Sequence, residues 1–341
     1  MTMTRNGTEL IPVQTPQRRW RRAMNSSSFW LVAILVVLIA VFLIAAPTSF
    51  GSLTNVRNIA LDASGLLLIS IGMTFVIITS GIDLSPGAVL VFSQVVAAKT
   101  MVAIGPEQPV LAITAGFLVG ILVGAGWGAI NGVLIAWGRI PPLVATLGTM
   151  GIALSLSLVM TNGLNVSGVP QQITAIGTTG LLGIPVIVIA ALVIAALAAV
   201  LLKQTKFGKL TFAIGSNVNA VRRAGMSEKP HLLKVYLGMG ALAGLAGILE
   251  IARFGTTAVN GHSTDALQAI AAVVIGGTSL FGGVGSLLGT LIGVFIPAVL
   301  RSGFLIVGLG AFWQQAAVGA VLIAAVYWDQ LKRKGRLGSK T

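Results

Sequence analysis

The chain has 341 residues, of which 55% are hydrophobic and 9% are charged, whereas an ordinary globular domain has about 25% charged residues. This composition excludes a soluble enzyme or a soluble nucleic-acid-binding protein, although the net charge is +14. Cys is absent, and His231 and His262 have no Asp or Glu partner at helical metal-ligand spacing, so we expect no disulfide, iron–sulfur cluster or metal site. The sequence predicts an integral membrane protein.

The apolar segments predict an all-α protein with about ten membrane-spanning helices. A helix needs about 20 apolar residues to cross the hydrocarbon core of a bilayer. We expect a basic tail over 1–27, one membrane domain over 28–331 and a second basic tail over 332–341. The candidate spans, in chain order, are 28–46, 59–80, 86–104, 110–137, 143–161, 184–202, 232–252, 265–281, 284–300 and 304–328.

The Lys and Arg residues predict the orientation of these spans. Most of them lie in the two tails and in the loop 203–231, and cytoplasmic segments carry an excess of such residues. The bias predicts six crossings before the loop and four after it, with both termini in the cytoplasm. Arg57, Arg253 and Arg301 then fall outside, either as anchors at the membrane interface or as partners for acidic patches on a soluble protein.

Two turns have related sequences and suggest an internal parallel repeat. Residues 79–87 join the second and third spans, and residues 275–283 join the eighth and ninth. We expect both turns on the cytoplasmic side, as in transporters built from two halves of like orientation. Glycines recur every four residues in the fourth and ninth spans, which favours close helix packing. These glycines are Gly116, Gly120, Gly124, Gly128 and Gly132, and Gly285, Gly289 and Gly293.

The first of these turns contains the acidic residue Asp83. Ser85 and Pro86 follow it and predict a side-chain cap and a first helical residue for the third span. Asp83 either holds this turn against the positive end of the helix dipole or belongs to a gate. The gate or hinge candidates are Gly81, Asp83, Ser85, Gly277, Thr278 and Ser279.

The loop 203–231 is predicted to carry a short helix over 217–224. Ser216 is the expected N-cap, and Gly225 is the expected C-terminal stop. Val218 and Val221 share one face of this helix, and Arg222 and Arg223 point elsewhere. Such a basic helix either rests on anionic lipid headgroups or contacts a protein partner.

The segment 203–231 resembles the coupling region of permease subunits of ATP-binding-cassette monosaccharide importers, the family of ribose, xylose, arabinose and galactofuranose permeases. The resemblance runs from about residue 50 to 328 and rests on an ordered set of motifs. These are 72–78 with 80–87, Asn131-Gly132, Pro142 with 145–149, 161–163, Phe207-Gly208, 213–217, 224–226, 269–280 and Gly282-Gly283.

The chain departs from the family pattern at three places. Ala266-Leu267-Gln268 stand where the family often has acidic residues, Leu154-Ser155 stand in place of Arg-Gly, and Val218 replaces a frequent Glu. These differences weaken any assignment of the particular sugar.

The resemblance implies a fold similar to that of cobalamin-importer permeases, in a bacterial cytoplasmic membrane. It implies two permease subunits, as a homodimer or with a paralogue, two ATPase subunits that bind ATP and Mg²⁺, and an extracytoplasmic sugar-binding protein. No cofactor is expected in this chain. The residues implied to couple to the ATPase are Gly215, Ser216, Asn217, Val218, Val221, Arg222, Arg223 and Gly225.

Neutral hydrogen-bonding side chains suit a path for a neutral polyol. The candidates are Thr146, Thr149, Ser155, Trp313, Gln314 and Gln315, and for each of them packing between helices is the simpler interpretation. Two alternatives stay open: an ion-coupled secondary transporter, or a permease of the same family for a solute other than a sugar. A membrane enzyme is disfavoured because the sequence lacks a carboxylate pair or a nucleophile–base set, and a self-contained pump because it lacks the Gly-x-x-x-x-Gly-Lys-Ser/Thr motif.

Overall fold

The computed structural model describes residues 27–310 except residue 182, and beyond 310 only residues 313, 316, 317, 319, 320, 323 and 327. The two basic tails and most of the expected span 304–328 therefore lie outside the described residues. The helices before the one short hairpin are α2 (Ser27–Ala45), α3 (Pro47–Phe50), α4 (Leu53–Ile78), α5 (Pro86–Ile104), α6 (Pro109–Ala136), α7 (Pro142–Thr161) and α8 (Gln172–Thr178). The helices after it are α9 (Val186–Gln204), α10 (Lys206–Arg223), α11 (Lys229–Phe254), α12 (Asp265–Ile275) and α13 (Leu287–Ile306).

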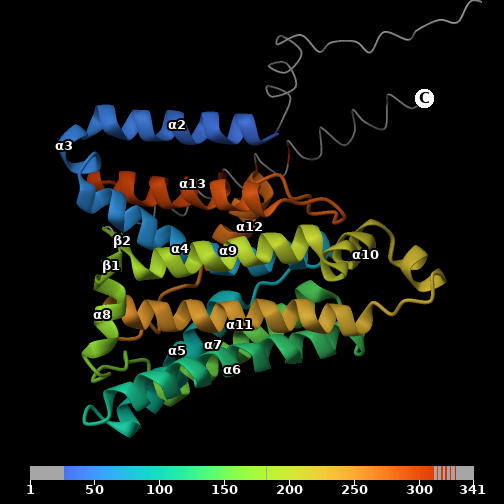
Figure 1. The fold of residues 1–341 in the computed structure, drawn as a ribbon, viewed down its shortest axis with the longest axis horizontal. Coiled ribbons are helices and arrows are strands. Elements are labelled where there is room, and N and C mark those ends of the chain that lie inside the picture. The colour runs from blue at the N-terminus through green and yellow to red at the C-terminus, as the bar shows by residue number, and fades with distance from the viewer. Residues whose placement is uncertain are drawn as a thin grey trace, which may run out of the picture.

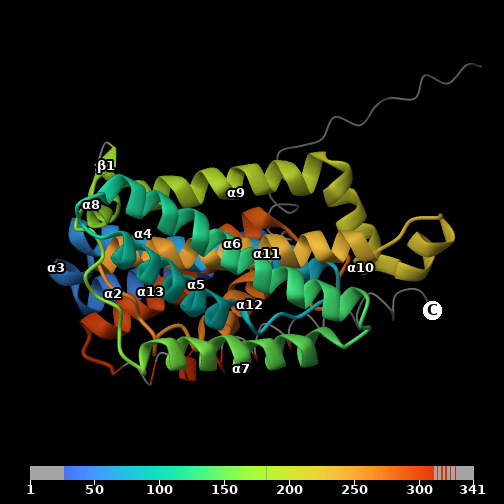
Figure 2. The same ribbon diagram turned by 90° about the horizontal axis from the view of Figure 1, so that it is seen from below.

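The long helices lie side by side as one bundle (Figure 1). Strands β1 (Gly180–Leu181) and β2 (Ile184–Pro185) form an antiparallel hairpin that pairs Leu181 with Ile184. The hairpin and α8 lie at one end of the bundle, which we call the α8 end, and α10 lies at the opposite end, the α10 end. Seen from below, α7 and α9 lie on opposite sides of the bundle (Figure 2).

Within the part of the chain that the structure describes, seven helices are long and apolar enough to cross a membrane: α4, α5, α6, α7, α9, α11 and α13. The residues Leu31–Ala45 of α2 and the whole of α12 form shorter apolar helices. Helix α4 begins at Leu53, six residues before the expected start, because the side chain of Ser52 caps it by accepting a hydrogen bond from the Asn55 N–H at 3.2 Å. Helix α12 ends at Ile275, earlier than expected, because Gly277, which follows the C-cap residue Gly276, adopts a φ of +90°.

Helix α4 is the central helix of the bundle, and α9 is peripheral. Most side chains from Leu67 to Ile78 of α4 are buried, whereas α9 exposes apolar side chains along most of its length. The exposed apolar face of α9 suits a helix that faces lipid, because apolar side chains are stable against the acyl chains of the bilayer.

Glycines allow the closest helix contacts, as the sequence predicted. Helix α11 packs most extensively against α6, where Gly240 lies against the backbone of Gly124 and Gly128. In the same way, Gly289 of α13 lies against the backbone at Gly276, just after α12. A side chain at these positions would overlap a main-chain carbonyl oxygen, so the backbones approach closely only because the Cβ atoms are missing.

Candidate functional site

Two turns meet inside the bundle towards the α10 end. We call residues 79–85, between α4 and α5, the first turn, and residues 276–286, between α12 and α13, the second turn. The main-chain N–H of Gly283 donates to the carbonyl oxygen of Ile78 at 2.9 Å. The hydroxyl of Ser80 donates to the carbonyl oxygen of Phe281 at 3.0 Å. The two segments that the sequence paired as a repeat therefore contact each other directly, while the relation of two halves by a repeat stays a prediction.

Helix α10 is broken at Asn217, which has φ −164° and ψ 93°. The Asn217 Oδ1 atom accepts a hydrogen bond from the Ala220 N–H at 3.0 Å, so Asn217 caps the short helix 218–223 that follows. The prediction of Ser216 as the cap is wrong by one residue, since Asn and Ser are both good caps and only the position of the break selects between them. Gly225 has φ +75° and ends the short helix, as expected.

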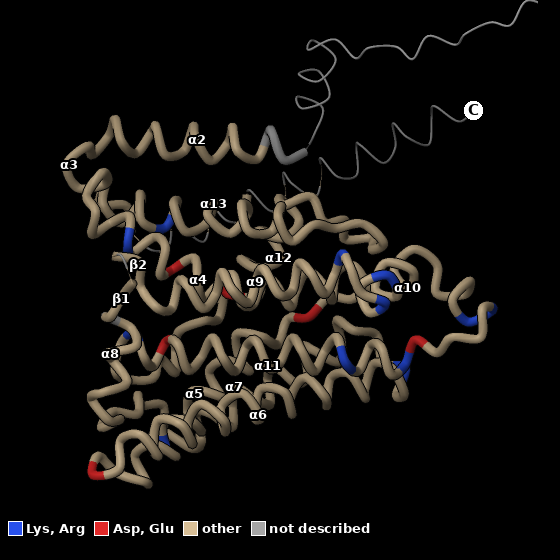
Figure 3. Tube along the Cα trace, viewed as in Figure 1, with Lys and Arg blue, Asp and Glu red and all other residues tan. Residues whose placement is uncertain are grey.

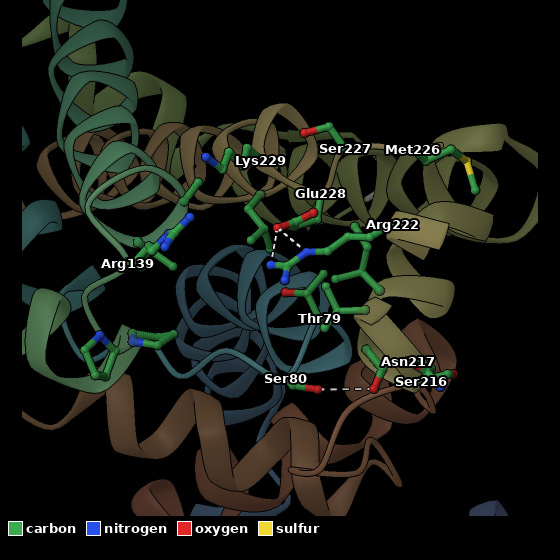
Figure 4. Close-up of a pocket in the computed structure, with 18 of the residues that line it drawn as sticks. Thr79, Ser80, Arg139, Ser216, Asn217, Arg222, Met226, Ser227, Glu228 and Lys229 are labelled. Carbon is green, nitrogen blue, oxygen red and sulfur yellow. Dashed lines mark hydrogen bonds and ion pairs between the residues drawn. The ribbon is translucent and has the colours of Figure 1, made fainter. Parts of the chain in front are cut away.

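The backbone just before the break in α10 packs against both turns. A side chain at Gly215 would overlap the Ile78 carbonyl oxygen and would lie 2.6 Å from the Gly283 nitrogen. The Ser80 hydroxyl also lies 3.3 Å from the carbonyl oxygen of Gly215, an interaction drawn in Figure 4. The close approach depends on glycine at position 215, and it joins α10, the first turn and the second turn into one junction.

A cleft of about 1190 Å³ lies beside this junction, and Figure 4 shows its labelled lining residues. Across the cleft, the Arg222 Nε atom donates to Glu228 Oε1 at 3.0 Å, and its Nη2 atom contacts the same oxygen. The hydrogen bond from Arg222 lowers the pKa of Glu228 from its ordinary value of 4.5. Glu228 is buried, whereas the guanidinium of Arg222 is exposed, so the ion pair ties the short helix to the start of α11.

The remaining residues of the short helix divide between the interior and the surface. Val221 is 3% exposed and packs within this chain, so it is not available to a partner as the sequence suggested. Val218 is half-buried, and Arg223 is exposed. The surface that this helix offers to a partner is therefore polar and basic.

Asp83 anchors a buried hydrogen-bond network between the first turn, α6 and α7. Its Oδ1 atom accepts from the Ser85 N–H at 2.8 Å and from the Ser85 hydroxyl at 2.6 Å. Ser85 in turn accepts from Asn131 Nδ2 at 2.9 Å, and Asn131 Oδ1 accepts from the Thr149 hydroxyl at 2.7 Å. The prediction that Ser85 caps the third span is wrong, because its hydroxyl is already committed to Asp83, although Pro86 does begin α5.

The path candidates occupy different environments. Thr146 and Thr149 are buried, and Thr146 accepts from the Leu84 N–H at 3.1 Å, so both hydroxyls are engaged within this chain. Ser155 is exposed on α7, and Trp313 is 66% exposed. Gln314 and Gln315 lie outside the described residues.

The gate candidates all lie in the two turns. Gly81 faces the buried Tyr236 of α11, whose hydroxyl would lie 2.5 Å from a Cβ atom at position 81. Gly277 has a positive φ, the Thr278 hydroxyl lies 3.4 Å from the Ser286 nitrogen, and the Ser279 N–H donates to the Val284 carbonyl at 3.0 Å. The turns are thus held by internal hydrogen bonds, and their movement as a gate stays a prediction.

Sequence reasoning missed a charged cavity near the α8 end. Arg253 Nη1 and Asp62 Oδ1 form an ion pair at 2.6 Å, and His262 Nδ1 lies 2.7 Å from Asp265 Oδ2. Burial alone would lower the pKa of His262, but the hydrogen bond and the charge of Asp265 outweigh burial and raise this pKa above 6.5. The sequence predicted no Asp or Glu partner at helical metal-ligand spacing for either histidine, whereas His262 pairs with Asp265, three residues further on.

The sequence contains these charged residues, but it does not show that Arg253 pairs with Asp62 and His262 with Asp265. Asp62, Glu250 and Asp265 lie near the ends of three different expected spans, and the sequence places Arg253 outside the membrane. The available signal was that several of these residues fall at the same end of different spans. Figure 3 shows the resulting pattern, in which Lys and Arg gather around the α10 end and charges of both signs lie towards the α8 end.

The apolar helices of membrane length define a multi-pass membrane protein, in which the junction of the two turns and α10 lies at one end of the bundle. The family model described as "Branched-chain amino acid transport system / permease component" matches residues 55–326, and the chain belongs to this family.

Curated relatives are similar to this chain over nearly its whole length. It is 35% identical over 318 residues to the D-allose transport system permease protein AlsC of Escherichia coli K12, with 92% of this chain and 96% of that protein covered. It is 36% identical over 307 residues to the ribose import permease RbsC of the same strain, with 89% and 93% covered. It is 33% identical over 330 residues to the galactose/methyl galactoside import permease MglC of Salmonella typhimurium LT2, with 91% and 98% covered. No solved structure gives a significant match.

Proposed function

We propose that this chain is the membrane-spanning permease subunit of an ATP-binding-cassette importer and that it carries a monosaccharide. The observation that supports this proposal is the similarity to allose, ribose and galactose permeases over about nine-tenths of the chain. The partners are two ATPase subunits, which bind ATP and Mg²⁺, an extracytoplasmic sugar-binding protein and a second permease subunit.

The α10 end faces the cytoplasm in this proposal, and both termini lie there, with ten spans in a bacterial inner membrane. The Lys and Arg residues around α10 support this orientation through the positive-inside bias. A single cysteine at Asn219, which is exposed on the short helix, tests it. This cysteine should resist an impermeant thiol reagent in intact cells and react after the membrane is permeabilised. Labelling in intact cells would contradict the orientation.

The short helix 218–223 transmits ATPase closure to the membrane domain. It connects directly to Gly215, which contacts both turns, so a displacement of the short helix reaches α4, α5, α12 and α13 together. The two permease subunits then alternate between outward-open and inward-open states. Exposed Ser155 on α7, beside the open-sided Gly148 and Gly151, favours α7 as the helix that faces the path or the second subunit.

Uptake into proteoliposomes tests the function. The chain is reconstituted with its ATPase and binding protein, and radiolabelled D-ribose, D-allose, D-galactose and L-leucine are offered with ATP on the ATPase side. We expect ATP-dependent accumulation of one of the sugars. The family description names branched-chain amino acids, which favours a non-sugar solute as the second candidate. Accumulation of leucine without any sugar would select that candidate.

The basic surface of the short helix is tested in the same assay. Arg223→Glu reverses an exposed charge and leaves the Arg222–Glu228 pair in place. We expect reduced ATP-driven uptake with an unchanged unfolding midpoint, because the variant weakens only the contact with the ATPase. Unchanged uptake would show that Arg223 does not contribute to docking.

A further inference from the structure

The cavity near the α8 end has the size of a small-molecule site. Its volume is about 550 Å³, within the range of about 300–1,000 Å³ that ligand pockets occupy. Helices α4, α5, α11, α12 and α13, the loop between α11 and α12, and Asn165 in the loop after α7 surround it. The charged and amide side chains that line it include Asp62, Glu250, Arg253, His262, Asp265, Gln268 and Arg301.

The charges around the cavity select against ions. The guanidiniums of Arg253 and Arg301 disfavour a metal cation, and the carboxylates of Asp62, Glu250 and Asp265 disfavour an anion. Carboxylates accept hydrogen bonds, whereas guanidinium and amide groups donate them. A neutral molecule with many hydroxyl groups, each able to donate and to accept, satisfies such a mixed lining.

The carboxylate of Glu250 can accept hydrogen bonds, and the described part of the protein donates none to it. Among the described residues, none forms a hydrogen bond with its carboxylate, although it lies within the bundle. Gly65 of α4 faces it: a Cβ atom at position 65 would lie 3.2 Å from Glu250 Oε1 and would have no other atom within 4 Å. The carboxylate therefore borders open space next to the charges of His262 and Arg253, but it accepts no hydrogen bond from the described residues. A carboxylate in such a cavity gains free energy when a bound molecule donates hydrogen bonds to it.

We propose that this cavity is a monosaccharide-binding subsite of the permease itself, with the Glu250 carboxylate accepting hydrogen bonds from sugar hydroxyls. The subsite deepens the proposed function and rests on it for the class of ligand. It lies near the α8 end, which faces away from the ATPase in the orientation proposed above. The permease thus holds the sugar on the side where the binding protein releases it, before the turns at the other end move.

Direct binding to the full-length chain in lipid nanodiscs tests the subsite without any transport partner. D-ribose, D-allose and D-galactose are the probes, and saturation-transfer NMR measures their binding. Glu250→Gln removes the charge, and charged acceptors form hydrogen bonds roughly twice as strong as neutral ones. Gly65→Leu keeps every polar group and fills the space in front of the carboxylate. Glu107→Gln, at an exposed loop position, is the matched control.

We expect at least one of the three sugars to bind the unmodified chain. Glu250→Gln and Gly65→Leu should each weaken this binding about tenfold or more, with Glu107→Gln unchanged. Thermal unfolding of each variant confirms that it is folded, and if one variant fails to fold, the other decides. Absence of binding by all three sugars, or equal binding by the folded variants, overturns the proposal. Stabilisation by Na⁺ or Ca²⁺ that Glu250→Gln abolishes, without sugar binding, also overturns it.

Uptake measured in parallel separates this proposal from the proposed function. Sugar uptake without binding at the cavity leaves the function in place and rejects the subsite. Sugar binding that depends on Glu250, in a reconstituted complex that accumulates no sugar, supports the subsite and rejects sugar import.

Discussion

The main-chain N–H of Gly283 donates a hydrogen bond to the carbonyl oxygen of Ile78, 2.9 Å away, across 205 residues of sequence. This bond joins the end of α4 to the turn between α12 and α13, and Gly215 of α10 packs against both of its partners. A movement of α10 therefore cannot reach one turn without reaching the other.

Gly215→Ala tests this junction. The added methyl group would overlap the Ile78 carbonyl oxygen and press on Gly283, and overpacking of this kind costs about 1–3 kcal/mol. We expect a lower midpoint of thermal unfolding in detergent and ATP hydrolysis that no longer drives uptake. Gly238→Ala, at a helical glycine with no atom within 4 Å of an added Cβ, is the control and should behave like the unmodified chain. Equal behaviour of the two variants would contradict the role of the junction.

Gly240→Ala tests the contact between α6 and α11. A Cβ atom at this position would overlap the Gly124 carbonyl oxygen and would lie 2.7 Å from the Gly128 nitrogen, so the two helices would have to separate. We expect the largest loss of thermal stability among single glycine-to-alanine changes in these two helices. Gly126→Ala in α6 meets no atom within 4 Å and should be neutral, or stabilising by up to about 1 kcal/mol because alanine favours the helix. Comparable midpoints for the two variants would refute close packing through Gly240.

Asp83→Asn and Asp83→Leu distinguish a hydrogen-bonding role from a requirement for charge. Asn keeps an acceptor for the N–H and the hydroxyl of Ser85, so we expect near-normal stability and uptake. Leu leaves these buried donors unpaired, at about 1–3 kcal/mol for each, and should unfold at lower temperature. Normal stability of Asp83→Asn combined with loss of uptake would instead assign the charge to a gate.

The pair of His262 and Asp265 predicts a pH dependence of stability. Asp265 raises the pKa of His262 in the folded chain, so the folded state binds a proton more tightly than the unfolded state does. The resulting stabilisation is fully present below pH 6.5 and is lost as the pH rises through the raised folded value. The difference in unfolding midpoint between the unmodified chain and His262→Gln should therefore be largest at acidic pH and shrink at alkaline pH. A difference that does not change with pH would show that the proton is not involved.

Local sequence signals located most of the helices and several of their ends. The apolar runs placed the membrane helices, Pro86 marked the start of α5, and Gly225 marked the end of the short helix. These features depend on residues close together in the chain, where hydrophobic length and backbone φ limit the possible structures. The glycine spacing likewise indicated close packing, although it did not identify α11 as the neighbour of α6.

The predictions of side-chain caps at Ser85 and Ser216 are wrong because nearby residues compete with each serine, and local sequence alone does not decide between them. Ser85 is held by Asp83 and Asn131, and the break in α10 occurs at Asn217, where the chain rests on the two turns. A hydroxyl group can satisfy several partners, so the choice depends on which groups the fold brings within reach.

The sequence by itself determined the membrane class, the positions of the long helices and the basic character of one end, because hydrophobic length and charge act locally. Only the tertiary structure decided that α10 contacts two turns at once, that Val221 is buried, and that Glu250 faces a cavity with Arg253 and His262. Those relationships join residues far apart in the chain, and their energies depend on distances of a few ångströms that are set by how the helices pack.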